Sequence, residues 1–361
     1  MPKPDREQIL AFRLAGHNLT RRLGPRSVTK AAAACGVQET PLGSAATAFR
    51  ARVEKLTPAL LDRTLFEDRT LVSLWAMRGA PYVVPAKDLG VFTVGALPLD
   101  PVSFKRSLGG WSDALEKVGL DPFETLERMA SAAQAVLDGR TLNVNELRDG
   151  IYRRVRSFSK VKRPAFARDD MPEPLFRAIG TTGSACIVAG RGTDAELARR
   201  FLHCYGPATT QQFADWTQRS LADAKKAFAL IEEELVDVTL DRAKGWLLRR
   251  DDKALSSPPE PTGVRLLPVQ DPYLQQRDRA TVLPKEADRR KLWQAVRGPG
   301  AVLLDGEIVA AWRARTKGTR LEVTIEPFGR LARPAREAIS AEAEGIAPFR
   351  GSQTAEITVA G

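Results

Sequence analysis

The segment Glu196–Asp251 constrains the fold most, because it carries the start and stop signals of three helices and a hairpin in close succession. Glycine and proline after Tyr205 end the first helix. Thr209 with Gln212 forms a capping box that opens the second helix, and Ser220 caps the third. Two apolar segments around a polar turn then predict a β-hairpin. The predicted elements are helices over 196–203, 209–216 and 220–231 and strands over 236–240 and 246–248.

Three helices followed by a hairpin are typical of a winged helix, whose third helix can enter a DNA major groove. A weaker copy of this order lies near the N-terminus. Its predicted elements are helices around 5–20, 28–35 and 44–56 and a hairpin of strands 71–75 and 82–84. A second weak copy follows a bridging helix over 121–137. It has a capping box at Asn143 and Glu146, a helix starting near Pro174 and a strand over 185–189.

The proline-rich segment Ser256–Pro261 is the clearest domain boundary, and strand patterns follow it. The predicted strands are 264–267, 301–304, 308–312 and 321–325, with a helix near 333–344. These pieces predict a small antiparallel sheet or barrel, and we expect the last ten or so residues to be poorly anchored.

The sequence therefore predicts an α+β chain of three tandem winged-helix modules followed by a C-terminal antiparallel β-domain with a small barrel-like sheet. We expect a first module with the candidate catalytic loop over 1–98 and a bridging helix with the second module over 99–193. The third module then covers 194–255, a linker 256–263 and the β-domain 264–361.

The chain is basic, with 55 Lys and Arg against 44 Asp and Glu, a net charge of +11. Such an excess favours a polyanionic partner, although a high arginine content without functional meaning is an equal alternative. Between Arg153 and Arg168 there are seven basic residues and no acid. Phosphate contact is the favoured interpretation of this run, and a solvated connector is the alternative.

The remaining composition favours a reduced protein of the cytoplasm, associated with the nucleoid. The N-terminus lacks a signal sequence, and no stretch is apolar enough to span a membrane. Three cysteines without close spacing fit neither a disulfide framework nor a zinc site. The two histidines, His17 and His203, lie in separate modules, so no metal and no cofactor is predicted.

The candidate catalytic loop lies between two helices of the first module, where Gly36, Pro41 and Gly43 bend the chain. Gln38, Glu39 and Thr40 can present three polar groups there. The alternative is a capping turn, with Ser44 as the N-cap of the next helix.

The whole chain, over roughly residues 5–350, resembles the AlkZ/YcaQ family of winged-helix DNA glycosylases. The resemblance rests on Val37–Thr40 with Arg50-Ala-Arg52, Tyr205–Thr209 with Phe213–Trp216, Leu266–Pro268 with Asp271–Tyr273, and Asp305-Gly306 followed by Trp312. It implies three winged helices curved around duplex DNA and a C-terminal β-domain. It also implies hydrolysis of the N-glycosidic bond of bulky alkylated purines, including adducts and crosslinks.

The catalytic motif of that family is Gln, an apolar residue, then Gln or Asp. Gln38 matches the first position, whereas Glu39 replaces the apolar residue and Thr40 the last. An alkylated purine is already a good leaving group, so a held water and a stabilised oxocarbenium-like sugar suffice. Gln38 could orient the water and Thr40 assist, while Glu39 serves only if the loop bends its carboxylate inward. The loop has no lysine for a Schiff base, which predicts a monofunctional enzyme.

Candidate contacts to double-stranded DNA are basic residues beside the loop, on the hairpins and in the basic run, each with an ordinary surface role as the alternative. They are Arg50, Arg52, Arg78, Arg153, Arg154, Arg156, Lys160, Lys162, Arg163, Arg219, Lys225 and Lys226. A monomer is expected. Besides a glycosylase, a non-catalytic tandem winged-helix DNA-binding protein stays open. A transcriptional regulator is the third possibility, but the sequence gives no clear dimerisation helix or ligand pocket.

Overall fold

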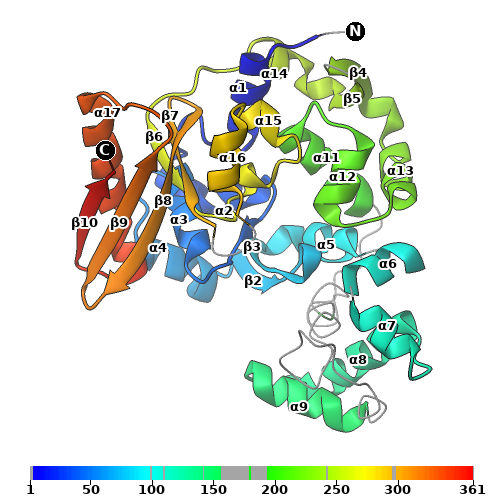
Figure 1. The fold of residues 1–361 in the computed structure, drawn as a ribbon. Helices are drawn as coiled ribbons and strands as arrows, with labels where there is room; N and C mark the ends of the chain where they lie inside the picture. Colours follow the sequence, from blue (N-terminus) through cyan, green and yellow to red (C-terminus); the bar gives the residue numbers. More distant parts are fainter. Residues whose placement is uncertain are drawn as a thin grey trace.

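The computed structural model describes residues 3–97, 100–108, 110–140, 142–155, 179, 193–240, 243–294 and 298–360. Figure 1 shows a sheet of long strands on one side of the molecule and a group of helices with a hairpin on the other. A separate helical lobe extends below them in that view. Within the described ranges, no helix combines the length and apolar character needed to cross a membrane.

The N-terminal region packs short helices around a three-stranded sheet. Its elements are α1 (Arg6–Gly16), α2 (Val28–Ala33), β1 (Val37–Gln38), α3 (Ser44–Arg52), α4 (Pro58–Asp62), β2 (Leu71–Trp75), β3 (Pro81–Pro85) and α5 (Leu89–Phe92). The predicted hairpin is β2 and β3, and β1 pairs antiparallel with the other edge of β3. The start of the candidate loop is thus a strand, which the sequence did not predict.

The helical lobe contains α6 (Pro101–Leu108), α7 (Gly110–Glu116), α8 (Pro122–Leu137) and α9 (Val144–Arg154). It has its own core, which includes Phe104, Trp111, Met129 and Ile151. Helix α8 is the predicted bridging helix. The capping box of Asn143 and Glu146 opens α9 as predicted. The predicted strand over 185–189 and the helix start near Pro174 lie outside the described residues.

The third region matches the predicted order of three helices and a hairpin. Its elements are α11 (Thr193–Tyr205), α12 (Thr210–Thr217), α13 (Leu221–Ala229), β4 (Leu235–Leu240), β5 (Ala243–Leu248) and the short α14 (Asp252–Ser256). The caps at Thr209 and Ser220 are both formed. Tyr82 and Phe92 of the N-terminal region share one hydrophobic cluster with Phe201 and Trp216 of this one, so the two regions pack as one body.

The C-terminal region is an open five-stranded sheet with helices beside it. Its elements are β6 (Val264–Leu267), α15 (Arg279–Val282), α16 (Glu286–Leu292), β7 (Gly300–Leu304), β8 (Glu307–Lys317), β9 (Arg320–Pro327), α17 (Arg333–Glu344) and β10 (Thr354–Val359). The strand order is β10-β9-β8-β7-β6.

Three expectations about this region are wrong. The sheet is not antiparallel throughout, because α17 carries the chain back along the sheet and β10 then runs parallel to β9. It is not a closed barrel, since β6 and β10 are its two edges. The last residues are anchored, because β10 pairs with β9 along its whole length.

A buried ion pair joins the N-terminal helices to the C-terminal region. Arg52, at the end of α3, donates two hydrogen bonds of 2.7 Å to the carboxylate of Asp271. Both side chains are at most 1% exposed. Arg52 also donates to the backbone carbonyls of His17 and Ala48, so its guanidinium is committed to the interior.

We expect Asp271→Ala to lower the free energy of unfolding by about 3–5 kcal/mol, because it leaves the Arg52 guanidinium buried without its counter-ion. Urea denaturation followed by circular dichroism measures this loss. The matched control is Glu286→Ala, which removes the exposed pair of Glu286 with Arg290 on α16 and should cost no more than about 0.5 kcal/mol. Equal losses in the two variants would contradict a structural role for the buried pair.

Candidate active site at the Gln38 loop

The candidate loop connects β1 to α3. Gln38 lies opposite Tyr82 of β3, and the backbone N–H of Glu39 still bonds the Pro81 carbonyl at 2.9 Å. The chain then leaves the sheet and turns at Gly43, whose φ of +84° is in the left-handed region that favours glycine. Helix α3 begins directly after this turn, at Ser44. Gln38 is therefore part of the sheet, whereas Thr40 lies in the loop between β1 and α3.

The side-chain oxygen of Gln38 is surrounded by donors. Its Oε1 accepts hydrogen bonds from Gln275 Nε2 at 3.0 Å, from the Tyr82 hydroxyl at 3.1 Å and from the Arg78 guanidinium at 3.3 Å. A guanidinium only donates, so the oxygen and not the nitrogen of the amide must face it. These contacts fix the orientation of the Gln38 amide.

The amide nitrogen of Gln38 is the part that remains available. The side chain is only 8% exposed. Among the described residues, Nε2 has no hydrogen-bond partner, yet it is not one of the fully buried polar atoms that lack one. We infer that Nε2 is the edge of the amide that meets solvent, and that it can donate to a water or a substrate oxygen.

Arg78 organises the contacts around this amide. Its guanidinium bonds the Tyr82 hydroxyl, Gln275 Oε1 at 2.7 Å and the Trp216 carbonyl at 2.7 Å. Burial raises the pKa of Tyr82, so its phenol stays protonated and donates at neutral pH. The prediction that Arg78 meets DNA from the hairpin tip is therefore corrected, because its guanidinium points into this network.

The carboxylate of Glu39 is used within the loop. It accepts hydrogen bonds from the backbone N–H groups of Gly43 at 2.7 Å and Ala45 at 2.6 Å, at the start of α3. A carboxylate at this position satisfies unpaired helix donors and is favoured by the helix dipole. The loop does cap a helix, as the alternative interpretation expected. The side chain that provides the cap is Glu39 and not Ser44.

A cleft of about 850 Å³ opens beside the loop. Thr40, Pro41 and Ser44 line one part of it, and residues of β8 and β9 line another. Its charged side chains are Arg313, Arg315, Arg350 and Glu322. Glu322 pairs with Arg320 and Lys317, so the cleft is predominantly basic. Thr40 and Leu42 of the loop are exposed, Leu42 by 85%.

Arg277, two residues after Gln275, brings a further positive charge near Arg78. Burial, followed by the nearby charges of Arg78 and Arg279, lowers the pKa of Arg277. Arg277 donates to the Asp215 carbonyl at 2.9 Å. Like charges this close are unfavourable alone, and a polyanion would relieve their repulsion.

The predicted DNA contacts divide into three groups. Arg52 and Arg219 are buried, and Arg219 bonds Asp194 at 3.0 Å and the Leu97 carbonyl at 2.9 Å, so the expectation that these two reach a phosphate is corrected. Arg50 pairs with Glu342 at 2.5 Å and is largely buried. The side chains that are exposed are Arg153, Arg154, Lys225 and Lys226. Arg156, Lys160, Lys162 and Arg163 lie outside the described residues.

Sequence reasoning missed Tyr82, Gln275 and the cleft arginines. Gln275 follows the Asp271–Tyr273 motif by two residues, so that motif was the available signal. Arg313 and Arg315 follow Trp312, the last residue of a predicted strand, and are two residues apart. A strand places such residues on the same face, so this spacing was the available signal.

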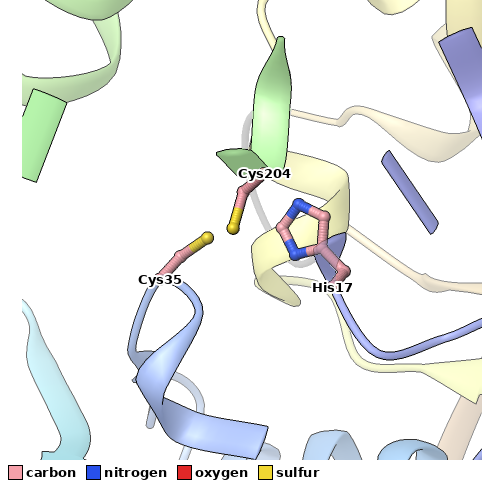
Figure 2. Close-up of side chains that lie close together, drawn as sticks. All are labelled: His17, Cys35 and Cys204. Carbon is pink, nitrogen blue, oxygen red and sulfur yellow. The ribbon is translucent and has the colours of Figure 1, made fainter. Parts of the chain in front are cut away.

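A second group of reactive side chains meets beneath the loop. His17 ends α1, Cys35 follows α2 and Cys204 lies on α11, yet their ligand atoms are all within 4.8 Å of one another. Figure 2 shows the two sulfur atoms pointing toward each other beside the imidazole. All three residues are buried. Burial lowers the pKa of His17 well below its usual value and raises that of Cys204, so both are uncharged at neutral pH.

Known proteins match this chain over nearly its full length. The family model described as DNA glycosylase AlkZ-like matches residues 31–349. The interstrand DNA cross-link repair glycosylase of Streptomyces sahachiroi is 23% identical over 372 residues, 95% of this chain and 96% of that protein. The solved structure of Streptomyces sahachiroi DNA glycosylase AlkZ superposes with a TM-score of 0.75 at 20% identity, over 99% of this chain and 100% of that one. This structural match shows a shared fold.

We expect Glu39→Ala to loosen the start of α3 and to lower the free energy of unfolding by about 1 kcal/mol, the usual value of a helix cap. Amide hydrogen exchange should accelerate at Gly43 and Ala45, whose N–H groups lose their acceptor. Glu260→Ala, which removes an exposed glutamate of the linker, is the control and should change neither quantity. Unchanged exchange at Gly43 and Ala45 in Glu39→Ala would refute the capping role.

Proposed function

Because the chain belongs to the AlkZ-like DNA glycosylase family, we propose that it hydrolyses the N-glycosidic bond of alkylated purines in duplex DNA. The observation that carries this proposal is the Gln38 amide, whose oxygen is held by three donors, on a loop whose following residues Thr40 and Pro41 line a basic cleft. The related Streptomyces protein is named a cross-link repair glycosylase. Bulky N7 and N3 purine adducts, including crosslinks, are therefore the substrates we propose.

The chemistry requires little acid–base catalysis from the loop. An N7- or N3-alkylated purine carries a positive charge and leaves with the electron pair of the N-glycosidic bond. The remaining sugar is an oxocarbenium-like cation, to which a water adds at C1′ and then loses a proton to solvent. Gln38 Nε2 donates to the water oxygen, and the exposed Thr40 hydroxyl accepts one of its hydrogens. Positioning of this kind accelerates hydrolysis, because it fixes the geometry in which the water attacks C1′.

Glu39 has no direct part in this mechanism. Its carboxylate caps α3, so it holds the loop in the conformation that exposes Thr40. The Gln38 oxygen is equally committed, because donors occupy it. The site then depends on the positive charge of the lesion for bond cleavage, and an unmodified purine is a poor substrate.

We further propose how the duplex is held. The N-terminal region, the helical lobe and the third region act as tandem winged helices along one duplex, within the domain boundaries expected from the sequence. The cleft arginines, Arg277 and the exposed basic residues of α9 and α13 neutralise phosphates. The basic run over 153–168 adds positive charge for binding the duplex, and the protein acts as a monomer on the nucleoid.

A non-catalytic DNA-binding protein is the second candidate function. The specific observation in its favour is that the only carboxylate of the loop is used as a helix cap. Such a protein would bind the same duplex through the same basic surface and leave the lesion intact.

An excision assay separates the two candidates. We expect the protein to release the base from a duplex with a single N7-methylguanine or a larger N7 adduct, with alkali then cleaving at the abasic site. Gln38→Ala should slow single-turnover excision by about 100-fold, because the water loses its positioning donor. Its affinity for the same duplex should be retained.

The matched control is Gln211→Ala, which removes an exposed glutamine of α12 and should leave the excision rate unchanged. Absence of excision by the wild-type protein on both lesions, with binding intact, would favour the non-catalytic candidate. Excision at the full rate by Gln38→Ala would refute the role of this amide.

The salt dependence of duplex binding tests the cleft. Wild-type affinity should fall by orders of magnitude between about 50 and 200 mM salt, and Arg315→Ala should reduce the slope of log K against log salt by about 0.9. Arg290→Ala on α16, an exposed arginine outside the cleft, should leave the slope unchanged. A wild-type affinity that does not respond to salt would contradict phosphate neutralisation.

A further inference from the structure

We propose that His17, Cys35 and Cys204 form a buried binding site for a thiophilic divalent cation, with Zn²⁺ as its ion. The sequence predicted no metal site, because the cysteines are far apart along the chain. Folding removes that separation, since the C-terminal end of α1, the end of α2 and α11 meet at one point (Figure 2). This proposal is independent of the glycosylase activity.

An unpartnered buried nitrogen points to a ligand at this place. His17 is 1% exposed, and its Nε2 has no hydrogen-bond partner among the described residues. A buried polar atom without a partner carries a free-energy cost and calls for an explanation. A metal ion bound at the imidazole nitrogen lone pair removes that cost.

The donor set suits zinc. Two thiolates and one neutral imidazole are typical zinc ligands, and Zn²⁺ with two thiolates has no net charge. A neutral cluster can be buried without the desolvation penalty of an isolated ion. Burial raises the pKa of the Cys204 thiol, so a bound metal ion must displace its proton. Binding is balanced by release of one proton from each thiol.

The separations are close to those of a zinc centre. With Zn–S bonds near 2.3 Å and a Zn–N bond near 2.0 Å, a tetrahedral ion holds such ligand atoms about 3.5–3.8 Å apart. The three ligand atoms lie within 4.8 Å of one another, so they must approach by little more than 1 Å at most. Three protein ligands leave one coordination position, which a water can fill.

A metal ion at this site would also affect the loop that carries Gln38. Cys35 is three residues before Gln38, and Gly36 and Val37 connect them. A metal held by Cys35 and Cys204 would tie the start of β1 to α11, and His17 would add α1. The ion would therefore stabilise the backbone from which the Gln38 amide projects.

Cobalt binding tests the site directly. The full-length protein, reduced and stripped with a chelator, is titrated with Co²⁺ alone. We expect one equivalent to produce a thiolate-to-cobalt charge-transfer band and the visible bands of a tetrahedral ion, and Zn²⁺ to displace them. Cys35→Ala and Cys204→Ala should each weaken Co²⁺ binding by more than about 100-fold.

Cys186→Ala and His203→Ala are the matched controls, because they remove the third cysteine and the other histidine and should keep the bands. Melting temperature gives a second measurement that does not depend on the cobalt spectrum. Zn²⁺ should raise it in the wild-type protein, and in the chelator the wild type and the two cysteine variants should melt within a few degrees of each other.

Failure of the wild-type protein to bind Co²⁺ would overturn the proposal. So would unchanged bands in Cys35→Ala or Cys204→Ala, or a Cys35–Cys204 disulfide in the purified protein that persists without metal under reducing conditions. Loss of excision activity alone bears on the glycosylase proposal and not on this one. If a cysteine variant fails to fold, the cobalt spectrum of the wild type still decides whether sulfur ligates the ion.

Discussion

The Arg78 guanidinium is the contact on which the candidate site depends. It bonds a side chain of β1, a side chain of the C-terminal region and a backbone carbonyl of α12, which are far apart in the sequence. Because a guanidinium can only donate, it forces both the Gln38 and Gln275 amides to turn their oxygens inward. The same cation therefore joins three parts of the chain and leaves the Gln38 nitrogen as the group that we propose meets a substrate.

Many positive charges of this basic chain serve the interior. Arg52 is paired with Asp271, and Arg219 with Asp194, in places that no phosphate can reach. Such pairs contribute little net stability beyond apolar packing, but the loss of one partner is costly. The Arg52–Asp271 pair joins the N-terminal helices to the C-terminal region. The charges that we propose for DNA binding lie in the cleft beside Thr40 and on the exposed faces of α9 and α13.

Local signals in the sequence predicted much of the fold, whereas contacts between distant residues could not be predicted. Thr209, Ser220 and Asn143 cap helices as expected, because a cap needs only its next three residues. The carboxylate partner of Arg52 is 219 residues away, so burial of this arginine left no local trace. For the same reason the pairing of β10 with β9, the Glu39 cap and the meeting of His17 with two cysteines became visible only in three dimensions.

We propose above all that the Gln38 amide nitrogen faces the deoxyribose of a duplex bound in the basic cleft. A crystal structure with a duplex that carries a stable abasic-site analogue tests it most directly. The expected result places Gln38 Nε2 within hydrogen-bond distance of the analogue or of one water between them, with Arg313 and Arg315 beside the phosphates. A duplex bound on another face, with the amide still shielded from the sugar, would contradict the claim.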